Sequence, residues 1–295
     1  KLKNKEYFEI FDNRSNLYLF FIYKCITHLN TNGELIFITP RDFLKATSAI
    51  KLNQFIYEHG TITHIIELGD KKIFEDASPN TIIWRFEKNN FKRETNIKQN
   101  FICNMGQLLF TNNRYPLILN EIAFVKVGAV SGSDKCFEHE DGIDFVCSYT
   151  QKTKKTKKMI YNKQHPFLNQ YKDILIQRKI RKFNELNWWE WGRKYFETNL
   201  QRIYVNNKTR AKKPFFESKI NAYDGSILAI FPRVKLTPLQ LKELCSDLNK
   251  VCWEELGFVV DGRHIFSQKS LENSMLPINF SKYLPTNKDS LLRLM

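Results

Sequence analysis

Residues 15–40 read SNLYLFFIYKCITHLNTNGELIFITP and contain the clearest structural pattern of the chain. After Ser15 or Asn16, either of which can cap a helix, apolar residues recur at helical spacing, and the apolar face they predict includes Phe21. The polar segment ending in Gly33 is typical of a turn that closes a helix. The run ELIFITP that follows is almost wholly apolar and predicts a buried strand of a mostly parallel sheet. The pattern therefore indicates an α/β fold.

The next residues repeat this pattern. A helix is predicted over residues 48–59, Gly60 stops it, and TITHIIEL (residues 61–68) is the next strand. TIIWRF (residues 81–86) forms a further strand after a loop of about a dozen residues, which is too short for a helical crossover. The last two strands are therefore expected to run antiparallel. The order helix, strand, helix, strand, strand is typical of the closing part of an α/β sheet.

The loop between these two strands contains an aromatic residue in a polar setting. Phe74 follows Lys71 and Lys72 and precedes Glu75 and Asp76. An apolar ring at this place either plugs the end of the sheet or presents a surface on which a flat, uncharged group lies.

The pattern changes in the second part of the chain. From about residue 116 the apolar runs are short and separated by turn sequences, and the alternation of helix and strand ends. This composition predicts an α+β domain of irregular topology. We therefore predict two domains, residues 1–115 and residues 116–295.

The charge is high and unevenly distributed. Lysine and arginine number 46 and aspartate and glutamate 31, which gives a net charge of +15. Residues 1–115 carry 16 basic and 12 acidic side chains, and residues 116–295 carry 30 and 19, so the net charges are +4 and +11. This excess favours an anionic partner such as nucleic acid, bound by the second domain. A general-purpose basic surface is the alternative.

Three basic clusters in the second domain are predicted to contact DNA phosphates, since mobile or forked cations on loops are what such contacts need. Their cations are Lys152, Lys154, Lys155, Lys157, Lys158, Arg178, Lys179, Arg181, Lys182, Lys208, Arg210, Lys212 and Lys213. A solvated face is the alternative for any single cluster. Three clusters in one domain favour DNA or RNA.

Two neighbouring segments are less specific. NWWEWGRKYF places Trp188, Trp189 and Trp191 beside two cations; such rings can stack on bases, but we predict that they form the core of a small domain. GAVSGSDKCF (residues 128–137) has two glycines that permit a close backbone approach. We interpret this segment as a DNA-facing loop, although it lacks the setting of a dinucleotide site.

Several classes of site and location are not expected. The six cysteines form no CxxC pair and are interpreted as reduced core thiols of a cytoplasmic protein. CFEHE (residues 136–140) contains metal-binding residue types, but no second ligand cluster accompanies it, and we predict a solvated loop and no metal. No apolar run is long enough to span a bilayer, and the first residues do not form a signal peptide.

Patterns for nucleophilic or acid–base catalysis are absent from the sequence, which has no GxSxG motif and no P-loop. Asp42, Glu67 and Asp70 lie near predicted strand ends, where sites of α/β proteins form. Carboxylates at such places more often cap helices or face water. We therefore assign no catalytic residue within this chain.

Taken in order, these features resemble the gamma-class, TaqI-like N6-adenine DNA methyltransferases. The (N/D)LY motif that opens a helix in that family matches Asn16, Leu17 and Tyr18, and an apolar strand ended by proline follows as in the family. Phe74 stands ahead of SPNTIIWRF, where the family has an aromatic residue before its last strand. YDGSILAIFPRVKL and ELGFVVDGRHIFSQKSLENSMLPINF resemble parts of the family's target recognition domain.

The resemblance implies a fold and two site residues. Residues 1–115 would be the C-terminal part of a Rossmann-like, S-adenosylmethionine-dependent methyltransferase sheet with a terminal antiparallel hairpin, and residues 116–295 an α+β target recognition domain. Phe74 would stack on an adenine flipped out of the duplex. Phe21 would border the S-adenosylmethionine pocket, with ordinary helix core as the alternative.

The resemblance also implies that parts of the family's site lie elsewhere. Its Gly-rich cofactor loop, its acidic ribose-binding residue and its (N/D/S)PP(Y/F) tetrapeptide precede the (N/D)LY motif, and this sequence contains none of them. We expect that this upstream part is missing here. The chain alone is then expected to bind DNA without methylating it.

The function expected from the resemblance is adenine-specific methylation of duplex DNA in a restriction–modification system, with S-adenosylmethionine as cofactor. The expected partners are double-stranded DNA and the missing N-terminal catalytic segment, and the complete enzyme is expected to be monomeric. The alternative is a non-catalytic DNA-binding specificity module, or a subunit that pairs with a separate catalytic chain.

Overall fold

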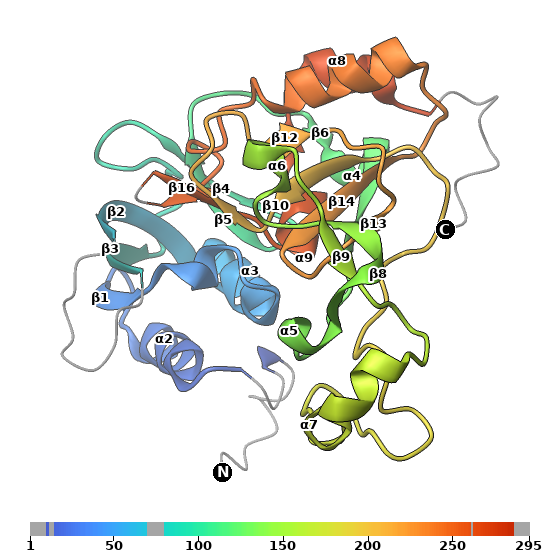
Figure 1. Ribbon diagram of the computed structural model, residues 1–295. Helices are drawn as coiled ribbons and strands as arrows, with labels where there is room; N and C mark the ends of the chain where they lie inside the picture. The colour runs from blue at the N-terminus through green and yellow to red at the C-terminus, as the bar shows by residue number, and fades with distance from the viewer. Residues whose placement is uncertain (1–9, 12–14, 70–79, 261, 286–295) are drawn as a thin grey trace. The chain divides into compact units, whose positions relative to one another are not determined.

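The computed structural model describes residues 10–11, 15–69, 80–260 and 262–285 (Figure 1). The chain divides into two compact units. Unit 1 comprises Lys1–Pro116, Cys252–Ile265 and Asn273–Pro277, and unit 2 comprises Leu117–Val251, Phe266–Glu272 and Ile278–Met295.

Two segments that the sequence assigned to the second domain therefore belong to unit 1. Cys252–Ile265 joins unit 1 because its side chains bond there: the carboxylate of Glu255 accepts hydrogen bonds from Asn113 and Tyr115. Asn273–Pro277 clusters with the same unit. The single predicted boundary between residues 115 and 116 therefore does not describe the two units, because the chain returns to unit 1 in these two segments.

The first part of unit 1 has the predicted order of elements. The helices and strands are α2 (Leu17–His28), β1 (Glu34–Pro40), the 3₁₀ helices η1 (Arg41–Leu44) and η2 (Thr47–Ala49), α3 (Ile50–His59), β2 (Gly60–Gly69) and β3 (Thr81–Lys88). The predicted order of helix, strand, helix, strand, strand is confirmed.

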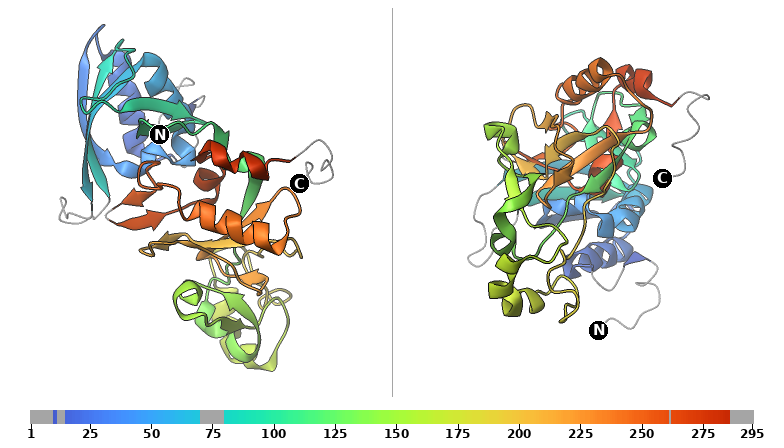
Figure 2. Two further views of the ribbon diagram at one scale, coloured as in Figure 1. Left: turned by 90° about the horizontal axis from the view of Figure 1, so that it is seen from above. Right: turned by 45° about the vertical axis from the view of Figure 1, so that its right-hand side comes forward.

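The sheet of unit 1 has the order β1-β3-β2, and both outer strands run antiparallel to β3. The antiparallel pairing of β2 with β3 is confirmed. The prediction of a buried strand in a mostly parallel sheet is wrong for β1, where the side chains of Ile36 and Ile38 are 64% and 50% exposed. The physical reason is that α2 and α3 both lie on one side of this sheet, as the left view of Figure 2 shows.

The core of unit 1 lies between these two helices and the sheet. Trp84 of β3 is buried there, and its indole Nε1 donates to Thr39 Oγ1 at 3.0 Å. Helix α2 buries Leu19, Ile22 and Ile26 in this core. Phe21 was predicted to belong to the apolar face of the helix but is 55% exposed, because it points away from the three buried positions.

A β-hairpin that the sequence analysis did not predict follows β3. Strands β4 (Asn100–Asn104) and β5 (Gln107–Thr111) pair antiparallel around Met105 and Gly106, which both have positive φ, 48° and 72°. Two positive φ values are those of a type I′ turn, which suits the twist of a two-residue hairpin. Buried Asn53 of α3 donates to Gly106 O at 2.8 Å and so holds the turn against the helix. The remaining strands of unit 1 are β15 (Val259–Val260), β16 (Arg263–Ile265) and β17 (Met275–Leu276).

Unit 2 is built from short helices and strands in small sheets. Its elements are β6 (Leu117–Ile118), α4 (Leu119–Ile122), β7 (Ala123–Val127), α5 (Asp134–Phe137), β8 (Glu138–Val146), α6 (Thr150–Thr153), β9 (Lys157–Met159), η3 (Pro166–Tyr171), α7 (Lys172–Ile176), β10 (Ile203–Asn206), β11 (Lys208–Thr209), β12 (Phe215–Phe216), β13 (Ala222–Tyr223), β14 (Ile227–Pro232), α8 (Pro238–Leu248), α9 (Gln268–Glu272) and η4 (Ile278–Tyr283). One sheet has the order β12-β10-β14-β7, and a second has the order β13-β8-β9. The chain as described is thus a mixed α/β protein with several small sheets.

Two aromatic cores stabilise unit 2. Trp191 is 2% exposed and Trp188 is 7% exposed in the core around β8, which confirms the prediction that these rings are core residues. Indole Nε1 of Trp191 donates to Ile160 O at 2.9 Å, so its polar edge is satisfied. Cys136, Cys147 and Cys245 are buried as predicted, but Cys252 is exposed. Among the described helices, none is long and apolar enough to cross a membrane.

Candidate functional site

The ends of β1 and β2 lie at one edge of the unit 1 sheet, because both strands run antiparallel to β3. Arg41, directly after β1, donates from Nε to both carboxylate oxygens of Glu67 at 2.7 and 2.8 Å. Its Nη1 donates to Gly257 O at 2.9 Å. The side chain of Arg41 is 11% exposed and that of Glu67 is 47% exposed. This half-buried ion pair ties the two strands together at the edge where ligand sites of open α/β sheets form.

Lys45 lies beside this ion pair and is partly buried. Its Nζ is 3.2 Å from Gln107 Oε1 and 4.2 Å from the ring centroid of Phe258. Burial, and then the charge of Arg41, lower the pKa of Lys45 well below its ordinary value. No carboxylate of the described residues forms an ion pair with this ammonium group, so a single amide and an aromatic face hold it.

Gly257 permits the close approach of both cations. Its φ is +73°, and a Cβ there would lie 3.0 Å from Lys45 Cε and 3.4 Å from Arg41 Nη2. A residue with a side chain would be strained in its backbone and crowded at this site.

A second polar group lies across the same region. Glu255 accepts hydrogen bonds from Asn113 Nδ2 at 2.7 Å, from Tyr115 OH at 2.8 Å and from the hydroxyl of Thr111. Burial opposes ionisation of Glu255, but these three donors outweigh it and lower the pKa of Glu255 below its ordinary value. The carboxylate therefore stays charged and fixed at neutral pH.

Together these residues line a pocket of about 620 Å³ within unit 1. Arg41, Lys45 and Glu67 form one part of its wall, and Glu254, Glu255 and Gly257 form another. A volume of this size lies within the range of small-molecule sites. Arg41 and Glu67 come from strand ends, but the segment after Cys252 carried no sequence signal that places it here.

The carboxylates expected near strand ends have different surroundings. Glu67 is exposed, as expected of a carboxylate that faces water, and it also pairs with Arg41. Asp42 is exposed in η1. Burial, and then the charge of Asp42, raise the pKa of Tyr18 at the start of α2 to about 12. Asp70 lies outside the described residues.

Of the two predicted aromatic site residues, Phe21 lies within the described part of the chain. Phe74 lies outside the described residues. The loop that carries it leaves β2 at Gly69 and enters β3 at Thr81, and Gly69 and Pro40 are both register partners of Thr81. Phe21, at 55% exposure, is not a core residue, so its ring is available to a ligand.

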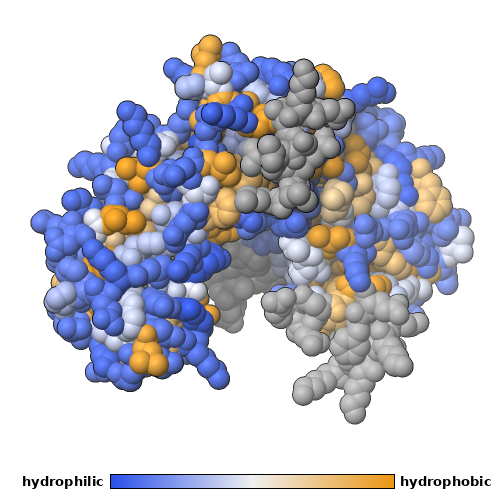
Figure 3. Space-filling model, turned by 90° about the vertical axis from the view of Figure 1, so that its right-hand side faces the viewer, coloured by the Kyte–Doolittle hydropathy of each residue, from blue (hydrophilic) through white to orange (hydrophobic). Residues whose placement is uncertain are grey.

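Most of the predicted DNA-contacting cations lie on the surface of unit 2. All thirteen are exposed except Arg178, which is buried, and Lys157, which is intermediate. The first and third clusters are neighbours, since Gln151 Nε2 donates to the carbonyl oxygen of Lys213. Figure 3 shows one face of the molecule, which hydrophilic side chains largely cover.

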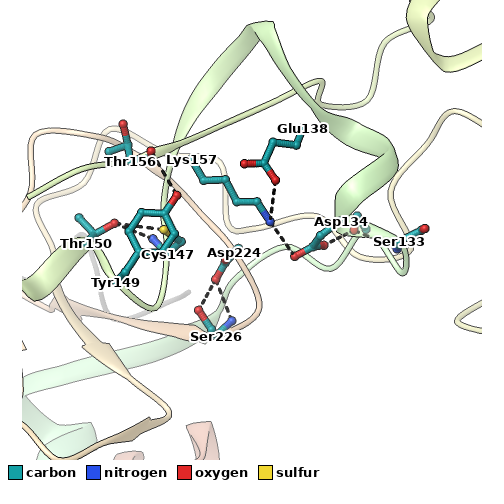
Figure 4. A network of polar contacts seen from close by, with 11 residues as sticks. Ser133, Asp134, Glu138, Cys147, Tyr149, Thr150, Thr156, Lys157, Asp224 and Ser226 are labelled. Atoms are coloured by element: carbon teal, nitrogen blue, oxygen red, sulfur yellow. Dashed lines mark hydrogen bonds and ion pairs between the residues drawn. The ribbon is translucent and has the colours of Figure 1, made fainter. Parts of the chain in front are cut away.

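Lys157 points into its own unit (Figure 4). Its Nζ lies 3.4 Å from Asp134 Oδ2 and 3.8 Å from Glu138 Oε2, and its side chain is 15% exposed. The two carboxylates neutralise it locally, so it offers little positive charge to a polyanion.

Arg178 has a structural role that the sequence did not indicate. It is 8% exposed and donates to the carbonyl oxygens of Leu175 at 2.7 Å, Trp188 at 2.6 Å, Glu190 at 2.9 Å and Ser131. A buried guanidinium that uses four of its five N–H donors on backbone carbonyls is not free to grip a phosphate, and we remove Arg178 from the DNA-contacting set.

The glycines of residues 128–137 serve packing inside unit 2. A Cβ on Gly128 would lie 1.9 Å from Asp224 O, and one on Gly132 would lie 2.5 Å from Ile180 Cδ1. Ser131 between them is fully buried. Both glycines are thus needed for close packing, while Gly132, Asp134 and Lys135 are exposed, and the interpretation of this segment as a DNA-facing loop stays a prediction.

The CFEHE segment has a neighbour that the sequence analysis missed. Asp141 Oδ2 lies 3.5 Å from His139 Nδ1 and 3.4 Å from His165 Nε2. Each histidine Nδ1 also accepts a backbone N–H at 3.2 Å, from Asp141 and from Phe167. Those bonds place the ring protons on Nε2, so His165 donates to Asp141 and lacks the free Nε2 lone pair of a metal ligand. We assign no metal to this cluster.

Comparison with known proteins gives consistent matches. The family model described as Eco57I restriction-modification methylase matches residues 1–74. The Type II methyltransferase M.HindII of Haemophilus influenzae is 24% identical over an alignment 369 residues long, which covers 92% of this chain and 70% of that protein. The Type II methyltransferase M.HincII of Haemophilus influenzae is 32% identical over 89 residues, which cover 30% of this chain and 18% of that protein. The similarity is to restriction–modification methyltransferases.

A solved structure shares the fold. The Type IIL restriction-modification enzyme MmeI, solved in complex with DNA, superposes with a TM-score of 0.57 at 10% identity. The match covers 88% of this chain and 41% of the MmeI chain, so this chain spans less than half the length of that enzyme. The relatives support a methyltransferase of a restriction–modification system.

Proposed function

We propose that this chain forms part of an adenine-specific DNA methyltransferase of a restriction–modification system, with S-adenosylmethionine as the methyl donor. Residues 1–115 contribute the second half of the catalytic sheet, and residues 116–295 contribute most of the DNA-recognition surface. The match of the methylase family model to residues 1–74 supports the first assignment. The excess of exposed cations in unit 2 supports the second.

The observation that carries the proposal is the place of the Phe74 loop. Thr81, where the loop ends, is flanked by Pro40 of β1 and by Gly69 of β2, where the loop begins, at the sheet edge where Arg41 and Glu67 line the pocket. A flipped adenine that approaches this edge would meet the described strand ends from which the loop departs.

The residues of this chain would bind and orient the base. An adenine inside a duplex cannot be reached until it rotates out of the stack, which costs a few kcal/mol of unstacking energy. Stacking on the ring of Phe74 returns on the order of 1–3 kcal/mol. The Arg41–Glu67 ion pair keeps the adjoining strand ends in register while the base is held.

The methyl group would come from bound S-adenosylmethionine. Phe21 fits one wall of such a site, because its ring is 55% exposed on α2 and can lie against an adenosine. Asp42 near the same end of α2 is exposed as well. The described residues supply no complete cofactor pocket, so no step of the reaction is assigned to them through the cofactor.

The proposal is tested by methyl transfer from labelled S-adenosylmethionine to plasmid DNA. The polypeptide that includes the upstream segment is expected to yield N6-methyladenine on digestion of the DNA, and the isolated 295 residues are expected to yield no methylated base. Methylated cytosine as the product contradicts adenine specificity. Methylation by the isolated chain contradicts the expected division of the site.

A non-catalytic DNA-binding specificity module is the second candidate, favoured by the exposed lysines of the adjoining first and third clusters. Such a module binds duplex DNA but gains no activity when the upstream-encoded polypeptide is added. Gel-shift competition between duplex DNA and RNA further separates both candidates from an RNA-binding protein.

A further inference from the structure

The wall of the unit 1 pocket carries an amine that no group of opposite charge neutralises. Lys45 lines the pocket and is partly buried. Within the described residues its Nζ donates to Gln107 Oε1 at 3.2 Å and lies 4.2 Å from the ring centroid of Phe258, and it forms no ion pair. An amide oxygen and a ring face stabilise an ammonium group less than a carboxylate does, so burial here favours the neutral amine.

The neighbouring side chain is a second cation. Arg41 Nη2 and Lys45 Nζ lie 3.4 Å and 3.8 Å from the one point that a Cβ on Gly257 would occupy. The guanidinium of Arg41 stays charged, and a like charge nearby disfavours the ammonium form of a lysine. Burial, and then the charge of Arg41, accordingly lower the pKa of Lys45 well below its ordinary value. A desolvated lysine beside another cationic group is a known arrangement for a nucleophilic amine.

The other titratable groups at the pocket do not supply the missing counter-charge. Glu67 binds Nε of Arg41 through both of its carboxylate oxygens. Glu255 accepts its hydrogen bonds from uncharged donors of its own surroundings. Glu254 and Cys252 also line the pocket, and both are exposed. The amine therefore stays available to a ligand.

The pocket gives a small molecule access to this amine. Its volume is about 620 Å³, and apolar side chains contribute to its wall, among them Leu44, Ile65, Leu109 and Val260. A volume of this size suits a small ligand. A ligand with an apolar body and an electrophilic carbon would bury the body against these side chains and present the carbon to Nζ.

We propose that Lys45 forms a Schiff base with small aldehydes that carry an apolar body and enter this pocket. The lone pair of Nζ forms the new bond to the carbonyl carbon, and the π electrons of the C=O bond move to the oxygen. The nitrogen then loses two protons, and the oxygen leaves with them as water. One amine and one aldehyde thus give one imine and one water, so the step needs no oxidant or reductant.

The surroundings of the amine suit this addition. Arg41 donates from Nε to Glu67 and from Nη1 to Gly257 O, and within the described residues its Nη2 donates no hydrogen bond. The N–H groups of Nη2 are thus available to the oxygen on which charge develops during the attack. This inference does not rest on the proposed function, because it involves neither DNA nor a methyl donor.

The test uses benzaldehyde and sodium cyanoborohydride, which reduces the imine to a stable benzylamine, on the folded 295-residue chain. Mass spectrometry of peptides measures the labelling rate of each lysine. At pH 7, Lys45 is expected to be labelled at least tenfold faster than Lys24, which is exposed on α2. Between pH 7 and pH 9 an ordinary lysine gains free amine about tenfold per pH unit, so the ratio of the two rates is expected to fall at least tenfold. Using a ratio cancels the pH dependence of the reagents.

Three comparisons show whether the folded pocket causes the reactivity. Lys45→Arg keeps the positive charge but cannot form an imine, and it is expected to lose this label alone. Arg41→Gln removes the neighbouring charge and is expected to lower the rate ratio at pH 7 at least threefold, in a variant whose melting temperature confirms that it is folded. In concentrated urea, where the pocket is lost, the ratio is expected to be close to one.

Three results overturn the inference. The first is a ratio of one or less in the folded chain at pH 7, and the second is a ratio that stays the same from pH 7 to pH 9. The third is an equal ratio in the folded chain and in urea, because the reactivity of Lys45 then comes from its local sequence. A ratio that Arg41→Gln leaves unchanged contradicts the part assigned to the neighbouring cation.

Discussion

Lys157 Nζ lies 3.4 Å from Asp134 Oδ2, and this ion pair turns one lysine of a basic cluster back toward its own unit. The neighbouring Lys154 and Lys155 are exposed and have no ion pair with described residues. A cluster that is uniform in sequence is therefore not uniform in the charge it presents. The difference can be measured, because only a cation that contacts phosphate releases counterions from DNA.

The double variant Lys154→Ala, Lys155→Ala is expected to lower the salt dependence of DNA binding. Each lysine that contacts a phosphate contributes about 0.9 to the slope of log K against log salt concentration. The slope is obtained from fluorescence anisotropy of a labelled duplex at several salt concentrations. Lys157→Ala serves as the matched control and is expected to leave the slope unchanged; an equal fall in both variants would show that the ion pair opens on DNA.

Arg178→Ala is expected to lower the free energy of unfolding by about 3 kcal/mol or more. Four backbone carbonyls lose a buried donor, and each buried group left unsatisfied costs about 1–3 kcal/mol, partly relieved by relaxation. Urea unfolding followed by tryptophan fluorescence measures the change. Lys179→Ala, next in sequence and exposed, is expected to stay within about 0.5 kcal/mol of the parent. Unchanged stability together with weaker DNA binding would restore Arg178 as a phosphate ligand.

Lys45→Met is expected to remove a pH dependence of stability. The folded-state pKa of Lys45 lies below its unfolded value of 10.5, so between those two values the unfolded chain binds more protons. Stability due to this residue therefore rises as pH increases through that window and is reduced throughout the range below it. The variant is expected to gain about 1 kcal/mol near neutral pH, because an apolar chain replaces a poorly paired charge. Lys24→Met, at an exposed position of α2, is the control. The measurement is the melting temperature at a series of pH values. If the melting temperatures of Lys45→Met and of the parent change with pH by the same amount, the assignment is contradicted.

The order of elements through residue 88 was predictable because hydrophobic periodicity reports local burial. The same periodicity cannot report which elements cover a strand, and β1 was predicted as buried although α2 and α3 cover one face only. The β4–β5 hairpin was missed because Met105, which has a positive φ in the turn, gives no turn signal, and because the hydrogen bond from Asn53 to Gly106 O that holds the turn is a tertiary contact.

The candidate site was predictable only in the residues that follow strands. Arg41 and Glu67 stand at strand ends, but Glu255 and Gly257 join them through a return of the chain across more than 140 residues, which the sequence pattern does not encode. Charge counting found the basic unit, yet it could not separate Arg178 from Lys179, because only packing determines which of two adjacent cations is buried.

Gly257→Ala is expected to destabilise the protein by about 1–2 kcal/mol. The backbone at φ +73° costs an alanine about 1 kcal/mol or more, and the new methyl group crowds Lys45 Cε at 3.0 Å. Gly257→Asn adds a Cβ as well but tolerates this backbone region better. If urea unfolding shows a smaller loss of unfolding free energy for Gly257→Asn than for Gly257→Ala, backbone strain is the main cause of the destabilisation. A fully stable alanine variant would mean that the segment relaxes away from Arg41 and Lys45.

Phe74→Ala in the enzyme that contains the upstream segment is expected to lower methyl transfer to normal duplex DNA by about tenfold or more. Loss of stacking removes on the order of 1–3 kcal/mol from the flipped state, and a factor of ten in rate corresponds to about 1.4 kcal/mol. A duplex with a mispaired target adenine provides the matched comparison, since its base leaves the helix at lower cost. The variant is expected to lose much less activity on that substrate, measured as single-turnover rates with labelled S-adenosylmethionine. Phe74→Tyr keeps a stacking surface and is expected to retain most of the rate on both substrates. Equal losses for Phe74→Ala on paired and mispaired targets would mean that the ring supports the fold of the loop and does not hold the base.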